Sequence, residues 1–197
     1  MSQSIGVIVL AAGQGSRFRQ VAGEDKDKLL ADCRGRDDGA VRSVIEHVLV
    51  NLPPTLDKRY LVTTADRPQV IRMAKAYDYE IVLIESTGMG DSIAAGVAES
   101  AQLDGWLMVL GDMPFILPSS IEHVVAQMGD DCISVPVQEG EYGHPVGFGR
   151  RFGPGLMTLS GDRGAKALFA QGRVVKVKVD DPGVLWDVDV PEKLNFK

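Results

Sequence analysis

Residues 5–15 have the sequence IGVIVLAAGQG, an unbroken apolar run that ends in a glycine-rich turn. A continuous apolar run of this length is typical of a strand that is buried on both faces of a parallel sheet. Further apolar segments predict strands at residues 59–63, 80–84, 105–110, 132–137 and 174–179. Helical patterns lie between most of these segments. The alternation indicates a three-layer α/β fold around a mostly parallel mixed sheet, and we expect residues 1–197 to form a single domain.

The spacing of apolar residues predicts helices at residues 43–52, 68–77, 91–101, 118–128 and 164–171. Ser43 is suited to cap the first of these helices, and Pro53 to end it. We expect residues 146–148 to pair with residues 132–137 as an antiparallel hairpin. Two further expectations are a last short strand at residues 185–188 and a surface turn at residues 34–40.

Composition restricts the class of protein. The formal net charge is −6 and the sequence pI is about 5.1, so the overall field does not attract nucleic acid. Cys33 and Cys132 are far apart in sequence and predict two reduced thiols. No apolar stretch approaches the length of a membrane span or forms a signal sequence. We therefore expect a soluble, cytoplasmic protein that binds neither nucleic acid nor membrane.

The glycine-rich turn is the first candidate site. Gly13 and Gly15 let the backbone approach a phosphate group closely, and Arg17 adds a guanidinium that suits phosphate oxygens. Lys28 would supply a second cation, with Lys26 as the alternative. The turn is not a dinucleotide fingerprint, because Phe18 stands where a third glycine is required, and it lacks the spacing of a Walker A motif. The pattern favours phosphate binding over a purely structural turn.

Three acids are candidate metal ligands. Asp112 follows the apolar segment at residues 105–110, where a carboxylate suits Mg²⁺, although it could instead cap the next turn. Asp187 and Asp189 alternate around Val188 and would point to one side of an extended segment. Two carboxylates on one side repel each other unless a cation or a basic side chain lies between them. A solvated strand end is the alternative for this pair.

Two weaker candidates complete the set. Gly88 and Ser92 lie where a helix begins and could bind an anion or a base edge, although plain helix capping by Asp91 or Ser92 explains the same residues. His144 follows a glycine-rich turn, and it could hold the phosphate of an acceptor. A surface or structural histidine is the alternative.

Taken together, these motifs resemble a known family. LAAGxGSRF, KLL, GMGDSIAAG, LGDMP, GHPVGF, LSGDRGAKALF and DVDVPEKL occur in this order. The chain is similar to the MobA-like NTP-transferases, and most similar to molybdenum cofactor cytidylyltransferases. The resemblance implies a Rossmann-like nucleotidyltransferase fold. It also implies a reaction in which a phosphate oxygen of a pterin attacks the α-phosphorus of a nucleoside triphosphate and pyrophosphate leaves.

The resemblance assigns roles to residues of this chain. Arg17, Lys28 and Asp112 would be catalytic, and Mg²⁺ would bind Asp112 together with Asp189 or Asp187. His144 would lie on the acceptor side. The residues implied in nucleotide binding are Leu10, Ala11, Ala12, Gly13, Gly15, Ser16, Arg17, Lys28, Gly88 and Ser92. Ala12 implies CTP in place of GTP, and a molybdoenzyme or its chaperone would be a partner.

The chain departs from the family pattern in two regions, one of which is residues 34–40, where a shorter turn is usual. The loop at residues 18–27 is longer and more acidic than usual, which leaves Lys26 and Lys28 as competing phosphate ligands. Three other functions remain open from the sequence. They are a sugar- or polyol-phosphate nucleotidyltransferase, a non-catalytic nucleotide-binding maturation factor for molybdoenzymes and, disfavoured by Phe18, an NAD-type oxidoreductase.

Overall fold

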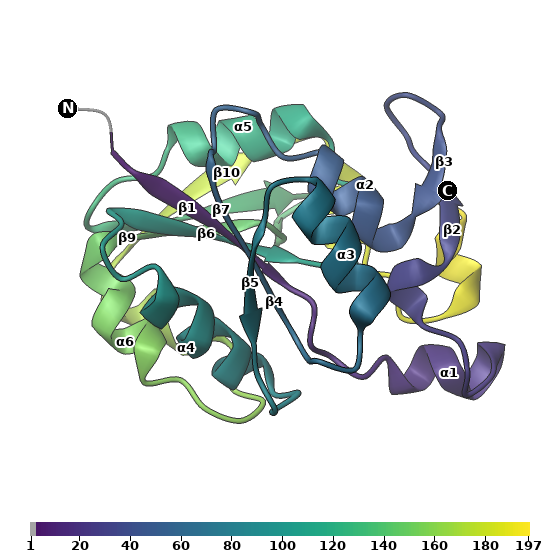
Figure 1. Ribbon diagram of the computed structural model, residues 1–197. Helices are drawn as coiled ribbons and strands as arrows, with labels where there is room; N and C mark the ends of the chain where they lie inside the picture. The colour runs from purple at the N-terminus through teal and green to yellow at the C-terminus, as the bar shows by residue number, and fades with distance from the viewer. Residues whose placement is uncertain (1–2) are drawn as a thin grey trace.

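The computed structural model describes residues 3–197 and contains one large mixed sheet flanked by helices (Figure 1). The strands follow the order β10-β7-β9-β6-β1-β4-β5, and β8 is attached to β7. They are β1 (Ile5–Leu10), β4 (Lys58–Thr63), β5 (Glu80–Leu83), β6 (Gly105–Leu110), β7 (Cys132–Gln138), β8 (Glu141–Tyr142), β9 (Val146–Gly149) and β10 (Arg173–Lys178). The strands expected at residues 5–10 and 105–110 are confirmed to the residue, and the other strands of this sheet that the sequence predicts agree within two residues.

The helices cover both faces of the sheet. They are α1 (Ser16–Ala22), α2 (Val44–Val50), α3 (Pro68–Ala76), α4 (Met89–Glu99), α5 (Pro118–Ala126) and α6 (Gly153–Met157). Alternate residues of β1 point to opposite faces: Val7 and Val9 pack with α2, α3 and α5, whereas Ile8 packs with α4. Ser43 caps α2 as expected, because its hydroxyl accepts a hydrogen bond from the Glu46 amide. The three-layer α/β arrangement is therefore confirmed.

Strand order decides where a ligand site can form. β1 pairs in parallel with β4 on one side and with β6 on the other, with Leu10 aligned to both Val62 and Leu110. The chain first builds the sheet outward through β4 and β5 and then returns to the opposite side of β1 at β6. Such a reversal opens a crevice at the carboxyl ends of the two strands involved. The turn after Leu10 and the turn after Leu110 therefore border one crevice.

The antiparallel strand forms as expected and takes a more central place. β9 pairs with β7, aligning Phe148 with Ile133, and it also pairs antiparallel with β6, aligning Phe148 with Trp106. β9 thus lies inside the sheet between two longer strands. The loop that precedes β9, which carries His144, is thereby held near the end of β6.

One expectation from the sequence is wrong, and the turn expected at residues 34–40 is present but has a further role. Residues 185–188 form no strand, because Asp181 caps a short 3-10 helix at Pro182–Leu185 and Val188 makes a single backbone contact, from its N–H to the Asp112 carbonyl at 2.8 Å. Residues 34–40 are more than a surface turn. They connect the two-stranded ribbon of β2 (Asp32–Arg34) and β3 (Val41–Ser43), and Arg36 in this turn points inward to a buried ion pair with Asp181.

Asp181 connects three parts of the chain. Its side chain is only 1% exposed and pairs with Arg36, and it accepts hydrogen bonds from the Leu117 amide at 2.9 Å and the Ser120 hydroxyl at 2.8 Å. The Gly183 amide donates a further hydrogen bond at 3.0 Å. The C-terminal segment is thereby fixed to α5 and to the β2–β3 ribbon. Within residues 3–197, no helix is long and apolar enough to cross a membrane.

Replacing Asp181 should destabilise the fold strongly. Asp181→Ala leaves Arg36 without its carboxylate in a partly buried place and removes three hydrogen bonds. Breaking a buried pair in this way costs about 3–5 kcal/mol, so we expect a loss of that size in the free energy of unfolding, measured by urea denaturation. The neighbouring exposed Asp180 is the matched control. Asp180→Ala should change stability by less than about 0.5 kcal/mol, and equal effects of the two substitutions would contradict the prediction.

Candidate active site

A cleft of about 130 Å³ lies where β1 and β6 end, lined by Leu10, Ala11, Ala12, Gly13, Lys28, Leu29, Thr87, Met89, Ser92, Leu110 and Asp112. Gly13 borders open space, because a Cβ added there would meet no atom within 4 Å. Gly15 has a φ of +64°, a conformation that favours glycine, and the Lys28 side chain packs over it. The turn therefore leaves room beside its backbone for a ligand, with Lys28 at the edge of that room.

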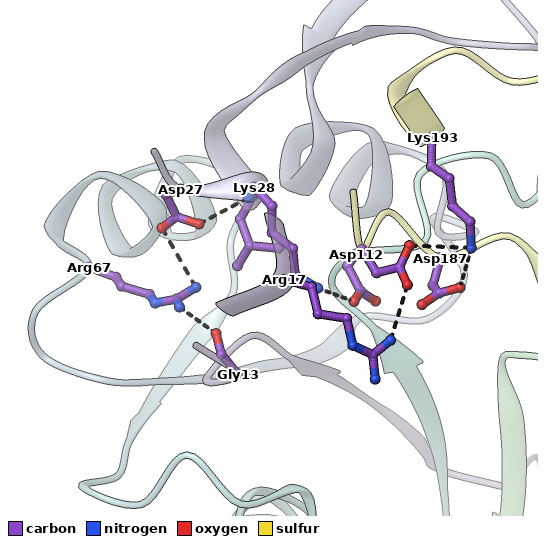
Figure 2. A network of polar contacts seen from close by, with 10 residues as sticks. Gly13, Arg17, Asp27, Lys28, Arg67, Asp112, Asp187 and Lys193 are labelled. Atoms are coloured by element: carbon purple, nitrogen blue, oxygen red, sulfur yellow. Dashed lines mark hydrogen bonds and ion pairs between the residues drawn. The ribbon is translucent and has the colours of Figure 1, made fainter. Parts of the chain in front are cut away.

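The basic and acidic candidate residues pair with one another, Lys28 with Asp112 in this cleft and Arg17 with Asp189 outside its lining. Lys28 Nζ lies 2.6 Å from Asp112 Oδ2 (Figure 2), and Arg17 Nη1 lies 3.2 Å from Asp189 Oδ2. Asp27 begins a 3-10 helix at Lys28–Leu30 by accepting a hydrogen bond from the Leu29 amide, which fixes the start of this turn. Lys26 instead contacts Asp25 on the surface, at 3.5 Å. The geometry therefore brings Lys28, and not Lys26, into the cleft.

Asp187 and Asp189 share a basic side chain that the sequence analysis assigned no role. Lys193, on the 3-10 helix Pro191–Leu194, places its Nζ 3.2 Å from Asp187 Oδ1 and 3.4 Å from Asp189 Oδ1 (Figure 2). Burial acts to raise the pKa of Asp189, but Lys193 and Arg17 outweigh this effect and hold the pKa below its usual range. Both acids do point to one side, and a lysine lies between them.

Arg67 is a second residue that the sequence analysis missed. Its guanidinium donates to the Gly13 carbonyl and lies 3.6 Å from Asp27 Oδ2, so it braces the glycine turn against the loop that carries Lys28 (Figure 2). The Arg67 side chain is 10% exposed. It comes from the start of α3, and no motif surrounds it, because its position depends on the pairing of β1 with β4.

The candidate residues at the start of α4, Gly88 and Ser92, have structural roles. A Cβ at Gly88 would lie 2.5 Å from the Gly161 carbonyl, and the Gly90 amide donates to the same carbonyl at 2.7 Å. These glycines therefore let α4 pack directly against the loop before the 3-10 helix Ala165–Gln171. Ser92 lines the cleft, but its hydroxyl already donates to the Gly88 carbonyl at 3.0 Å. Neither Asp91 nor Ser92 caps α4.

His144 borders a second, larger cavity of about 310 Å³ that shares Leu10, Met89 and Leu110 with the first. Aromatic and aliphatic side chains form most of its wall, among them Phe148 and Phe169, and Lys166 lies at its border. The Nδ1 atom of His144 is buried and has no hydrogen-bond partner in the described part of the chain. A polar atom in this condition is suited to bind a ligand group.

The donor set fits a divalent ion that is shared with a substrate. Among residues 3–197, no group of three or more His, Cys, Asp or Glu side chains is placed to hold a metal ion by itself. Asp189 Oδ1 is buried and accepts no hydrogen bond, and the Val188 amide ties this segment to Asp112. Mg²⁺ is commonly bound by one or two carboxylates and by substrate phosphates, and the acids here would supply the carboxylate part of such a donor set.

Comparison with known proteins identifies the family. The family model described as "MobA-like NTP transferase domain" matches residues 7–177. This chain belongs to that family. The resemblance expected from the motifs is thus confirmed, and the family description places the chain among the nucleotidyltransferases. Asp187 and Asp189 lie beyond the matched residues, so their pairing with Lys193 and Arg17 is known from the geometry alone.

Individual relatives of this MobA-like domain are distant. The bifunctional protein GlmU of Prochlorococcus marinus (strain MIT 9313) is 26% identical over 153 residues, which is 75% of this chain and 32% of that protein. The chain therefore spans about a third of this curated relative. A nucleotidyl transferase from Methanothermobacter thermautotroptrophicus has a TM-score of 0.79 and 20% identity, covering 98% of this chain and 94% of that one. The manganese complex of Rv0371C from Mycobacterium tuberculosis has a TM-score of 0.66 and 21% identity, covering 98% and 96%.

Stability of this MobA-like domain should depend on pH through His144. Burial lowers the pKa of His144, and nearby Asp112 and Asp187 offset this only in part. The unfolded chain, with a histidine pKa of about 6.5, therefore binds more protons than the folded chain below that pH. The free energy of unfolding should fall between pH 7.5 and pH 5.5, measured by urea denaturation at each pH, and His144→Asn should reduce that fall.

His123 offers a matched control, since it is exposed on α5. His123→Asn should leave the difference in stability between the two pH values as in the unmodified protein. An unchanged difference in His144→Asn, or an equal reduction in both variants, would contradict the role given to the burial of His144.

Proposed function

We propose that this protein transfers CMP from CTP to a phosphorylated acceptor, molybdopterin or its molybdenum-loaded form, with Mg²⁺ and with release of pyrophosphate. One observation carries the proposal. Gly13 of the glycine turn, Lys28 and Asp112 border one cleft at the ends of β1 and β6, and next to it Arg17 pairs with Asp189, whose segment is hydrogen-bonded to Asp112 through the Val188 amide. A phosphate-binding turn and carboxylates in one crevice are what transfer between phosphate groups requires.

The triphosphate would bind along the glycine turn. Open space at Gly13 gives its backbone access to phosphate oxygens, and Lys28 and Arg17 bring two positive charges to the same place. Arg67 holds the Gly13 carbonyl and so fixes the turn. These groups would offset the negative charge that grows on the leaving pyrophosphate. Because they are fixed before the nucleotide arrives, little reorganisation is needed during the reaction.

Asp112, with Asp189 or Asp187, would hold Mg²⁺ in this proposal. When bound, the ion would neutralise phosphate charge and polarise the α-phosphate. Support comes from the position of Asp112 beside the glycine turn and from the backbone contact between Asp112 and Val188. The structural neighbour crystallised with manganese is also consistent with a divalent ion in this fold.

The acceptor would lie in the second cavity. Its wall is mainly apolar and aromatic, with Phe148 and Phe169 among the lining residues, and His144 provides the unpartnered Nδ1. A flat ring system suits such a wall better than a sugar, whose many hydroxyl groups need hydrogen-bond partners. The acceptor phosphate is already anionic, so the chain need only orient it. A general base is therefore not required, and the described residues that line the first cleft include no histidine.

Ala12 supports the choice of cytidine. This residue borders the first cavity and also a shallow depression that contains Thr64 and Glu85. A methyl group between the phosphate turn and this depression narrows the space available to a purine. In the family resemblance, alanine at this position accompanies CTP.

A pyrophosphate-release assay with each of the four nucleoside triphosphates, with and without molybdopterin, tests the proposal. We expect release with CTP and Mg²⁺ only when molybdopterin is present, because the second cavity must be filled for transfer. A sugar phosphate or polyol phosphate should not replace molybdopterin. Release that depends on such an acceptor, or nucleotide binding without any release, would contradict the proposal and support one of the two other functions.

Asp112→Ala should separate turnover from nucleotide binding. We expect turnover to fall by about 10²–10³-fold, the size of loss found when one group that stabilises charge in a transition state is removed. CTP affinity measured without Mg²⁺ should stay the same or increase, because Lys28 loses the carboxylate that competes with phosphate. The measurements are steady-state kinetics and calorimetric titration with CTP. Asp57→Ala, which changes an exposed acid before the amino end of β4, is the control and should leave both quantities unchanged.

A further inference from the structure

Each acid of the candidate site is paired with a basic side chain. The pairs are Lys28–Asp112 at 2.6 Å, Arg17–Asp189 at 3.2 Å, Lys193–Asp187 at 3.2 Å and Lys193–Asp189 at 3.4 Å. Three positive and three negative side chains therefore balance one another. A cation that enters this site has to displace a basic group from the carboxylates it binds.

Lys193 differs from the other two basic groups in its position. Arg17 and Lys28 belong to the glycine turn and its following loop, where a triphosphate would draw them from the acids. Lys193 reaches the acids from the C-terminal segment, and its ammonium lies between the two carboxylates. Its backbone is fixed, because Trp186 Nε1 donates to the Lys193 carbonyl at 2.9 Å. The flexible four-carbon side chain can nevertheless move without disturbing the turn.

We infer that Lys193 is an internal cation that competes with the divalent ion for Asp187 and Asp189, so that the ion binds tightly only together with the nucleotide. The inference rests on the proposed function for the presence of a divalent ion. It adds a positioning role for a residue that does not contact the reacting atoms. Its consequence is a coupling of metal binding to nucleotide binding.

The charges explain the coupling. A divalent ion alone would meet carboxylates that are already neutralised, and the described residues do not offer a group of three donor side chains. Phosphate oxygens would complete the ligand set, and the same phosphates would take Arg17 and Lys28 from Asp189 and Asp112. The freed carboxylates then favour the ion over the single charge of Lys193. By linkage, the ion must tighten nucleotide binding by the same factor.

The test is a titration of the nucleotide-free protein with Mn²⁺, in which free Mn²⁺ is followed by electron paramagnetic resonance. Lys193→Met and Lys193→Gln should each bind Mn²⁺ about tenfold more tightly than the unmodified protein, near the low end of the 5–150-fold range usual for coupled sites. Lys193→Arg keeps the charge and should stay close to the unmodified protein. Lys75→Met changes an exposed lysine of α3 that forms no ion pair within residues 3–197, and it should have no effect.

The possible outcomes separate this inference from the proposed reaction. Unchanged or weaker Mn²⁺ binding in both neutral variants, or no Mn²⁺ binding in any of the proteins, overturns the role of Lys193 even if CTP-dependent pyrophosphate release is observed. Tighter binding in both neutral variants but not in Lys193→Arg supports it, even if no acceptor yields pyrophosphate. Tighter binding in Lys193→Arg as well would show that the length of the side chain, and not its charge, limits metal binding, and would also overturn the inference.

Discussion

The in-register parallel pairing of β1 with β6 is the constraint on which the site depends. Leu10 is aligned with Leu110, so the two turns that follow these residues leave the sheet at the same level. One turn carries the glycines, and the other carries Asp112. A shift of one residue in this register would turn every side chain of one strand to the other face of the sheet, where its packing is wrong. The apolar packing on both faces therefore also sets the distance between the phosphate-binding turn and the carboxylate.

Charge balance explains how a site with so many ionic groups remains stable without a ligand. Unpaired carboxylates in a partly buried cleft would repel one another and raise the free energy of the fold. Here each acid has a basic partner, and the partners come from the start of the chain and from its last residues. The ion pairs thus connect sequence segments that the sheet alone does not connect. A bound nucleotide and metal would replace these ion pairs with new contacts. The same charged groups would then stabilise the fold when paired with one another and bind the ligands when separated.

Much of this arrangement could be predicted from the sequence, and the failures have physical reasons. Unbroken apolar runs of six residues bounded by turns predict β1 and β6 to the residue, because runs of this length are typical of strands buried on both faces. The meeting of Gly13, Lys28 and Asp112 follows from the rule that ligands bind where parallel strands end. The strand expected at residues 185–188 was wrong, because alternation in so short a segment does not supply a partner strand. Arg67 was missed because its role arises only when β1 and β4 bring distant residues together.

Arg36 points inward and helps to position the C-terminal acids Asp187 and Asp189, although it lies outside the cleft. Asp187 and Asp189 belong to no strand, and a single backbone contact, from Val188 to Asp112, joins their segment to the end of β6. One such hydrogen bond contributes only about 0.5–1.5 kcal/mol. Ordering the backbone of several residues costs more than this in conformational entropy, at about 1–2 kcal/mol for each residue. The buried Arg36–Asp181 pair fixes the chain a few residues before the two acids. The hydrogen bond from Trp186 Nε1 to the Lys193 carbonyl fixes it a few residues after them. With both sides held, the two acids stay beside Asp112, so the ribbon of β2 and β3, although outside the cleft, helps to set its geometry.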